Sequence, residues 1–503
     1  MKRGRAMNMA SKIFLSCFFL WAGVSGLSAQ NTSRPDENAL FGSDQRNDEK
    51  NDEKNPDADG RNKSGDRDDS EKSQDKLDNP FQIGGNFYYR FIASPQRDVA
   101  AIDMPISLPL QLDAFLDGRP NDRIRVFVNA RLLYDATRDK YSQTTKGTNL
   151  GSTQTSSTAT VTTTTNTQPN NPDVALDQAW LKFDILRTVF VTAGNQHVKW
   201  GTSRFWNPTD FINTQKRDPL LQQDLRLGLP MLRFDVPLQF ISSNFSAMAF
   251  FNQPQPASTA GQLGGAARYE ILIGETEIGF DVVYRDHEKY KDNLVYGVDL
   301  SSSLGPFDVY AEGACITRQQ SPHYTLTDKP IAGKDLSQFF TSDDLATPLF
   351  EASGGLNFSF GWLENRQATL GAEYFYNQTG YASSSIYPIL ILNGQYQPFY
   401  VGQHYAAVYL VAEGPDAGKH TSYTLSVLSN LSDKSLIGRI DFTWNFLNYM
   451  NFQFFVDGRF GAKGGEFNFA LDTPALTYKG GYIPAINIPE TIFDVGLALQ
   501  TRF

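Results

Sequence analysis

Apolar and polar residues alternate through most of the chain from about Phe81 onward. Residues 493–503 show the pattern without a break: Phe, Val, Leu, Leu, Thr and Phe occupy one set of positions, and Asp, Gly, Ala, Gln and Arg occupy the other. Successive side chains of a β-strand point to opposite faces, so this pattern predicts a strand with one apolar and one polar face. Residues 106–117 and 123–134 repeat it on either side of Gly-Arg-Pro-Asn at 118–121, which predicts a hairpin with its turn there.

The same reading predicts about 18 antiparallel strands, an even number of the kind that closed barrels use. The patterns of residues 403–413 and 421–430 are weaker, so about 16 strands is the alternative. Short predicted turns alternate with long connections at residues 135–172, 199–229, 318–348, 377–402 and 462–490. The predicted strands begin near residues 82, 106, 122, 174, 188, 230, 243, 266, 276, 293, 306, 349, 367, 403, 420, 435, 450 and 491.

The composition fits a barrel whose outer face is apolar. Mean hydropathy is -0.38, and aromatic residues make up 13% of the chain, including 37 Phe and 22 Tyr. After the N-terminus no apolar run approaches the roughly 20 residues of a membrane-spanning helix, but in a barrel only alternate residues face lipid. A soluble β-sandwich or β-helix, which also alternates, is the alternative.

With its alternating strands and terminal Phe503, the chain resembles bacterial outer-membrane β-barrels of the Gram-negative, porin-like type. The resemblance implies an all-β transmembrane barrel in the bacterial cell outer membrane, in contact with outer-membrane lipid. It also implies that the barrel-assembly machinery recognises the C-terminal strand ending at Phe503. Even strand parity places both ends of the barrel on the side of the short turns, which is the periplasmic side.

Three segments differ in composition. Residues 1–29 combine basic residues, a short apolar core and Leu-Ser-Ala before Gln30, which predicts a cleaved signal peptide; a retained anchor is the alternative. Residues 30–79 are charged and nearly free of apolar side chains, which predicts a disordered periplasmic tail. Residues 80–503 form the predicted barrel.

One part of the tail has the spacing of a calcium-binding loop. Asn55, Asp57, Asp59 and Asp66 fall at ligand positions of an EF-hand-like loop, with Gly60 at the turn. Pro56 interrupts the loop, Lys63 takes a ligand position, and no apolar helices flank it. We therefore expect a solvated charge run, with no metal and no cofactor.

A barrel of about 18 strands is too wide for side chains to fill, so its lumen is expected to hold water. The net charge of -10 argues against nucleic-acid binding. Charged residues on the polar faces are candidates for the pore lining, with the two signs on different strands. They either filter solutes through a transverse field or only keep the lumen wet. The candidates are Arg123, Arg125, Arg131, Lys182, Asp113, Asp281, Asp299 and Glu312.

The connection around residues 199–229 is the most distinctive one. Its Trp-Gly…Asn-Pro-x-Asp pattern is similar to one found in some porin-like Gram-negative proteins. Asn-Pro at 207–208 and Asp-Pro at 218–219 predict two short helices, because Asn and Asp cap helices and Pro suits the first turn. The segment either folds inward and narrows the lumen or caps the rim. The candidate constriction residues are Lys199, Trp200, Arg204, Trp206, Asn207, Asp210 and Arg217.

The sequence therefore predicts a channel for passive diffusion of small hydrophilic solutes, with anionic solutes favoured by the arginines of residues 123–131. The alternative is a non-conducting barrel whose loops serve adhesion or envelope organisation. No enzyme is expected, because catalytic motifs are missing and the histidines are scattered. The histidines are His197, His287, His323, His404 and His420.

Overall fold

The computed structural model describes residues 80–503, except 138–145, 148–162, 165–171, 214, 222–223, 252–262, 286–292, 320, 329–333, 417, 419 and 479–480. The predicted signal peptide, the predicted tail with its candidate calcium loop, and His287 lie outside the described residues. So does most of the connection after residue 137.

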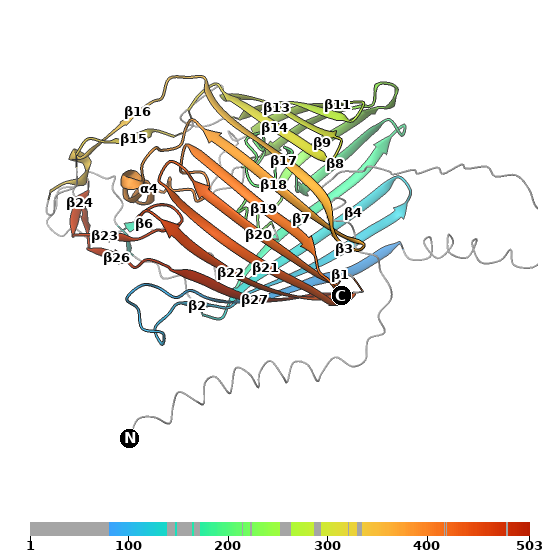
Figure 1. Cartoon of the computed structure of the whole chain (residues 1–503). Helices are drawn as coiled ribbons and strands as arrows, with labels where there is room; N and C mark the ends of the chain where they lie inside the picture. Colours follow the sequence, from blue (N-terminus) through green and yellow to red (C-terminus); the bar gives the residue numbers. More distant parts are fainter. Residues whose placement is uncertain are drawn as a thin grey trace, which may run out of the picture. The chain divides into compact units, whose positions relative to one another are not determined.

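The described part of the chain forms a closed antiparallel barrel of 18 strands (Figure 1). Each strand pairs with the next along the chain, and β1 pairs with β27 to close the ring. β2 and β3 follow one another along β1 and count as one strand of the wall. The predicted strand number is confirmed, including the two weaker segments, which form β19 and β20. The wall consists of β1 (Phe81–Ala93), β2 (Ile106–Ser107), β3 (Pro109–Asn121), β4 (Ile124–Asp135), β7 (Asp173–Ile185), β8 (Val189–Gln196), β9 (Leu229–Leu238), β10 (Ser243–Phe251), β11 (Leu263–Ile273), β12 (Thr276–Arg285), β13 (Asn293–Leu304), β14 (Phe307–Ile316), β17 (Leu349–Leu363), β18 (Arg366–Asn377), β19 (His404–Glu413), β20 (Thr421–Asn430), β21 (Ser435–Leu447), β22 (Met450–Gly461) and β27 (Phe493–Arg502).

The two rims of the barrel differ in the length of their connections. Short turns, such as residues 186–188 and 448–449, join strands at one rim, where β1 begins and β27 ends. The long connections join strands at the other rim, which also carries one short connection at residues 431–434. The turn predicted at 118–121 is displaced, because β3 continues to Asn121 and pairs it with Ile124 across a bulge. Both ends of the barrel therefore lie at the short-turn rim, as predicted.

The outer face of the wall is apolar. In β27 the buried side chains are Asp494, Gln500 and the small residues between them, whereas Phe493 and Leu497 are exposed. The same alternation leaves large apolar side chains exposed around the ring, among them Phe280, Leu356, Tyr423, Leu425, Val427 and Ile440. No helix among the described residues is long and apolar enough to cross a membrane.

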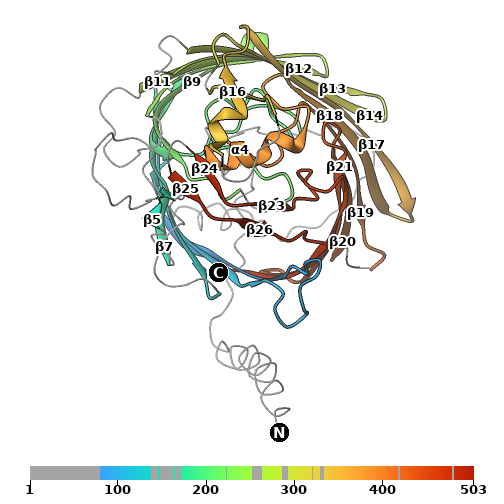
Figure 2. The same cartoon turned by 90° about the vertical axis from the view of Figure 1, so that its left-hand side faces the viewer.

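The long connections carry further structure at their rim (Figure 2). Figure 2 looks into the barrel from this side and shows α4 and β23–β26 lying across the opening. Leu336, Ile386, Tyr387, Leu390 and Tyr478 form a buried apolar cluster that joins three of these connections. The elements outside the wall are β5 (Lys146–Gly147), β6 (Thr163–Thr164), η1 (Gln239–Ile241), β15 (His323–Leu326), η2 (Leu336–Gln338), β16 (Phe340–Asp343), η3 (Ser384–Ile386), α4 (Tyr387–Leu392), β23 (Leu471–Thr473), β24 (Leu476–Tyr478), β25 (Gly481–Ile483) and β26 (Ile486–Ile488).

Candidate functional site

The connection between β8 and β9, residues 197–228, crosses the lumen; we call it the inner loop. Ser203 and Trp206 of this loop bond to side chains on β14, β17 and β18. Eight neighbouring strand pairs separate β8 from β18, running through β9–β14 and β17, which is nearly half of the 18-strand ring. The loop therefore spans the barrel interior from one wall to nearly the opposite wall.

Glu312 on β14 is the first anchor of the inner loop. Its carboxylate accepts hydrogen bonds from the backbone N–H groups of Thr202 and Ser203, both at 2.6 Å, and from the Thr209 hydroxyl at 2.8 Å. The amide of Asn207 donates to the same carboxylate at 3.2 Å. Gly201 has a φ of +89°, and a Cβ on this residue would lie 2.6 Å from the carboxylate. Glycine is therefore required where the loop turns around Glu312.

Glu373 on β18 is the second anchor. Its carboxylate accepts hydrogen bonds from the successive N–H groups of Arg204, Phe205 and Trp206, at 2.8, 3.1 and 2.8 Å. The Tyr310 hydroxyl donates to it at 2.8 Å. A carboxylate offers about four acceptor positions, so these four donors satisfy a group that would be costly to bury alone. Five consecutive backbone donors, from Thr202 to Trp206, thus bind two carboxylates of the wall.

An aromatic cluster holds the same segment from its other side. The Trp206 side chain is fully buried and stacks on Phe375, with ring centroids 5.9 Å apart and planes 11° apart. It also lies 5.4 Å from the Tyr405 ring and donates its indole N–H to the Phe399 carbonyl at 2.9 Å. Arg204 lies over the Tyr409 ring at 4.2 Å. Apolar packing and ionic hydrogen bonds therefore fix the tip of the inner loop together.

Polar contacts fix both ends of the inner loop. Asp177 on β7 accepts from Arg131 at 3.0 Å and bonds the His197 ring at 2.8 Å, and its backbone carbonyl accepts from Gly228 N–H. Further along, Arg226 donates to Asp210 at 2.8 Å. The loop is thus tied down at its start, its middle and its end.

The two helices predicted in the inner loop are not found among its described residues. Asn207 and Asp218 each begin only a single turn, in which the Asp210 and Leu221 N–H groups donate to their carbonyls. The Arg285 side chain takes the carbonyls of Phe211 and Ile212, which a helix would need as acceptors for its next turn. Bonds to the wall therefore replace the helical hydrogen bonds.

The other candidate constriction residues also lie in ordered places on the inner loop. Trp200 is buried in an apolar cluster with Val198 and Ile212. Lys199 is buried, and this burial lowers its pKa, with the nearby Arg217 acting in the same direction. The Arg217 side chain donates to the Leu221 carbonyl at 3.4 Å. The structure therefore places Lys199, Trp200, Arg204, Trp206, Asn207, Asp210 and Arg217 on one segment inside the barrel.

Arg125 and Arg131 lie on β4 and Arg123 immediately precedes it, and their acidic partners lie on the neighbouring strands β3 and β7, so the two signs pair locally rather than face each other across the lumen. Arg125 pairs with Asp117 at 2.9 Å, and Arg131 pairs with Asp113 at 2.9 Å. Arg123, at the short-turn rim, makes a 2.9 Å ion pair with Asp184. Alternation identifies which charges face inward but cannot identify their cross-strand partners.

The remaining wall candidates also have partners. Arg268 on β11 is the basic partner of Asp281 at 2.7 Å and Asp299 at 2.6 Å. Lys182 on β7 lies over the Phe190 ring at 5.8 Å. The wall carries ion-paired ladders in which opposite charges neutralise each other locally, and Glu312 serves as a loop anchor.

A buried acidic group at the long-connection rim was not predicted from the sequence. Glu466 accepts from the Tyr405 hydroxyl at 2.7 Å and from the Asn430 amide at 2.8 Å, and its backbone N–H donates to Asp433 at 2.6 Å. Burial raises the pKa of Glu466 to about 7, against the lowering effect of these hydrogen bonds. The described residues contain no group of three or more His, Cys, Asp and Glu that could hold a metal ion.

A closed barrel satisfies all of its strand hydrogen bonds within the wall, and this barrel presents an apolar face outward. Only helices and closed barrels meet the requirements of a membrane interior. The fold is therefore that of a membrane-spanning β-barrel. The exposed apolar side chains of the wall strands form the face that such a barrel turns toward lipid.

Comparison with known proteins adds little beyond the fold. A family model described as "Protein of unknown function (DUF1302)" matches residues 95–283 of the barrel chain. No curated protein matches the chain.

Among solved structures, three porin-type barrels are similar to this barrel. A Rhodopseudomonas blastica porin triple mutant is 12% identical, with a TM-score of 0.40, over 84% of this chain and 100% of that one. OccK8 (OprE) of Pseudomonas aeruginosa is 7% identical, with a TM-score of 0.45, over 84% and 98%. OprB of Pseudomonas putida is 10% identical, with a TM-score of 0.41, over 86% and 97%. At this distance the fold assignment rests on the observed strand pairing.

Proposed function

We propose that this barrel is a passive channel for small hydrophilic solutes and that the inner loop restricts what passes. The observation that carries the proposal is the path of residues 202–206 across the lumen, anchored on Glu312 and Glu373. A segment bound this firmly divides the lumen in a fixed way. The size of the remaining passage then depends on the loop rather than on the wall.

The width of the barrel supports a channel. Barrels with 16–18 strands leave an aqueous space that wall side chains cannot fill. Many inward positions of this wall are charged and paired with one another, as in Arg268 with Asp299, whereas apolar inward positions such as Phe375 pack against the inner loop. A wall of this kind stays hydrated and offers transient hydrogen bonds to polar solutes, whereas it disfavours apolar ones.

A preference for anions was predicted from Arg123, Arg125 and Arg131. Each of these residues makes an ion pair with an aspartate, so the field that it presents to a passing anion is reduced. Neutral and zwitterionic solutes therefore fit the wall better than the sequence suggested. We propose no enzymatic role: His197 and His404 bond to Asp177 and Tyr374, and each contact orients a side chain of the barrel.

Liposome swelling tests the proposal. The folded chain is reconstituted into liposomes, which are then diluted into isotonic solutions of arabinose, glucose, sucrose and raffinose. The proposal predicts swelling that is fast with the smallest sugar and falls with size. Absence of swelling with every sugar, from protein that keeps its folded, heat-modifiable mobility in gels, would favour a non-conducting barrel that displays loops.

A further inference from the structure

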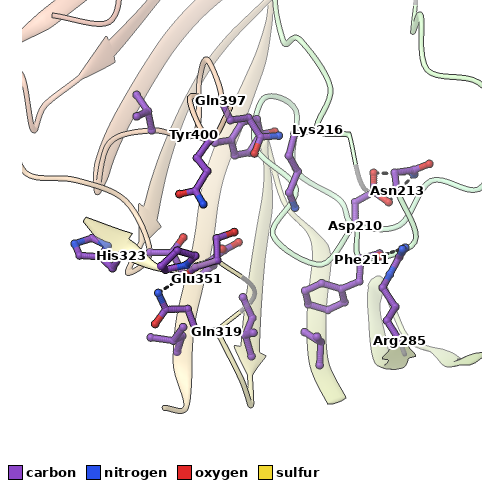
Figure 3. Close-up of a pocket in the computed structure, with 18 of the residues that line it drawn as sticks. Asp210, Phe211, Asn213, Lys216, Arg285, Gln319, His323, Glu351, Gln397 and Tyr400 are labelled. Carbon is purple, nitrogen blue, oxygen red and sulfur yellow. Dashed lines mark hydrogen bonds between the residues drawn. The ribbon is translucent and has the colours of Figure 1, made fainter. Parts of the chain in front are cut away.

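A cavity of about 300 Å³ lies inside the barrel near the long-connection rim (Figure 3). Its walls come from four regions: the inner loop, the ends of β12–β14 and β17, the connection between β14 and β17, and the connection between β18 and β19. Figure 3 shows Lys216 and Glu351 extending from different walls toward this space. A solute that enters from the long-connection side would meet this cavity at the inner loop.

Most charges around the cavity are already paired. Asp210 pairs with Arg226 at 2.8 Å. Arg285 donates to the backbone carbonyls of Phe211 and Ile212. Burial lowers the pKa of His323, so this ring is neutral near pH 7 and adds no charge. Among the described lining residues, two charged side chains remain to be considered, one cation and one anion.

The cation is Lys216 and the anion is Glu351. Among the described residues, neither side chain has a hydrogen-bond or ion-pair partner within bonding distance. Lys216 comes from the inner loop and lies 5.7 Å from the centroid of the Tyr400 ring. Glu351 extends from β17 toward the same space, where burial opposes its ionisation and the positive charge of Lys216 favours it. Their charges therefore face the same space without being joined.

Uncharged polar and aromatic groups complete the lining. The side-chain amides of Gln395 and Gln397 also line the cavity, and both are without a hydrogen-bond partner among the described residues. Phe211 and Tyr400 provide ring surfaces. Within the described part of the chain the site therefore offers one unpaired cation, one unpaired anion and free amides, which matches a small molecule that carries both charges and a polar side chain.

We propose that this cavity binds a zwitterionic amino acid, with the ligand carboxylate at Lys216 and the ligand ammonium at Glu351. The inference rests on the proposed channel function and specifies one solute class for it. A dicarboxylate would meet Glu351 unfavourably, and a diamine would meet Lys216 unfavourably. A neutral diamide would leave both charges without partners.

Calorimetric titration of the folded full-length chain in detergent tests the proposal, with L-glutamine as the probe. Lys216→Met and Glu351→Gln should each weaken binding about tenfold or more, because each removes one charged hydrogen-bond partner. Lys463→Met and Glu364→Gln are the matched controls, since both residues are exposed and lie outside the cavity lining. They should leave binding unchanged. Glutarate and glutaramide should bind at least about tenfold more weakly than L-glutamine to the native chain.

Two results would overturn the proposal: no heat of binding with L-glutamine, or equal binding by the native chain and both cavity variants. Gel mobility confirms that each variant is folded. The swelling assay on the same preparations separates this inference from the channel function. Swelling without L-glutamine binding rejects the cavity site and keeps the channel, whereas L-glutamine binding without swelling rejects the channel and keeps the site.

Discussion

The backbone N–H of Trp206 donates a 2.8 Å hydrogen bond to the carboxylate of Glu373, which lies 167 residues further along the chain. The bond joins the tip of the inner loop to a strand nearly opposite the point where the loop leaves the wall. Because backbone N–H groups are donors in every sequence, the position of this contact is set by the carboxylate. Glu373 therefore determines where the loop crosses the lumen.

Glu373→Gln should loosen the tip of the inner loop. An amide offers one oxygen where the carboxylate offers two, and its NH₂ would face the three N–H donors and the Tyr310 hydroxyl. Leaving such donors without acceptors costs about 1–3 kcal/mol. We expect single-channel currents with a larger mean conductance and more open-state noise. Glu364→Gln, at an exposed short turn, is the control, and equal traces from both variants would refute the anchoring role.

Trp206→Ala should release the loop tip more completely. The side chain is fully buried between Phe375 and Tyr405, and truncating a buried aromatic residue costs about 3–5 kcal/mol. The wall strands do not depend on this packing, so the heat-modifiable mobility of the barrel should persist while permeation of larger sugars increases. Trp444→Ala removes an exposed tryptophan of the outer face and should change neither size selectivity nor conductance. Unaltered sugar selectivity in Trp206→Ala would mean that the loop does not limit passage.

The free energy of unfolding should fall as the pH rises from the ordinary pKa of a glutamate, 4.5, to the raised pKa of Glu466, about 7. Burial raises the pKa of this carboxyl group from 4.5 to about 7, so the folded state binds the proton more tightly than the unfolded state. The stabilisation is complete below about pH 4.5 and is lost by about pH 7, and it amounts to about 3 kcal/mol. The melting temperature in detergent should therefore be higher at pH 5 than at pH 8. Glu466→Gln should show a smaller difference between the two pH values, and an undiminished difference would assign the effect to other groups.

Replacing Arg123, Arg125 and Arg131 together with Gln should shift the channel toward cations. The change removes three positive charges and leaves Asp184, Asp117 and Asp113 without these partners. The reversal potential in a KCl gradient should move in the direction of K⁺ selectivity. Arg187→Gln, on a turn residue whose side chain is 76% exposed, is the control. Identical reversal potentials for the triple variant and the native chain would show that these arginines do not influence permeating ions.

The wall of the barrel could be predicted because its physics is local. Each strand must show one face to lipid and one to the lumen, so residues such as Leu425 and Ser426 reveal their faces by alternation alone. Strands that follow one another along the chain pair with each other, and only β1 with β27 joins distant segments of the described wall. The ion pairs could not be predicted, because Arg125 could face several carboxylates and only the register selects Asp117.

The inner loop was recognised as unusual, but its structure was not predicted. Asn207 and Asp218 are residue types that cap helices well. Hydrogen bonds to distant wall residues such as Arg285 and Glu312 nevertheless replace the bonds that a helix would form. The acceptors for the loop backbone are two glutamates, Glu312 and Glu373, and in the sequence each looks like any other polar residue on the lumen face of a strand. Helix α4 and the η3 turn before it were missed, although Ser383 caps η3 by accepting from the Ser385 N–H and Pro388 lies in the first turn of α4.

Single-channel recording in planar bilayers tests the central claim most directly. The account predicts stable, ohmic openings from the native folded chain, smaller than those of the Trp206→Ala variant recorded under the same conditions. A bilayer that stays electrically silent after insertion of correctly folded native protein would contradict it.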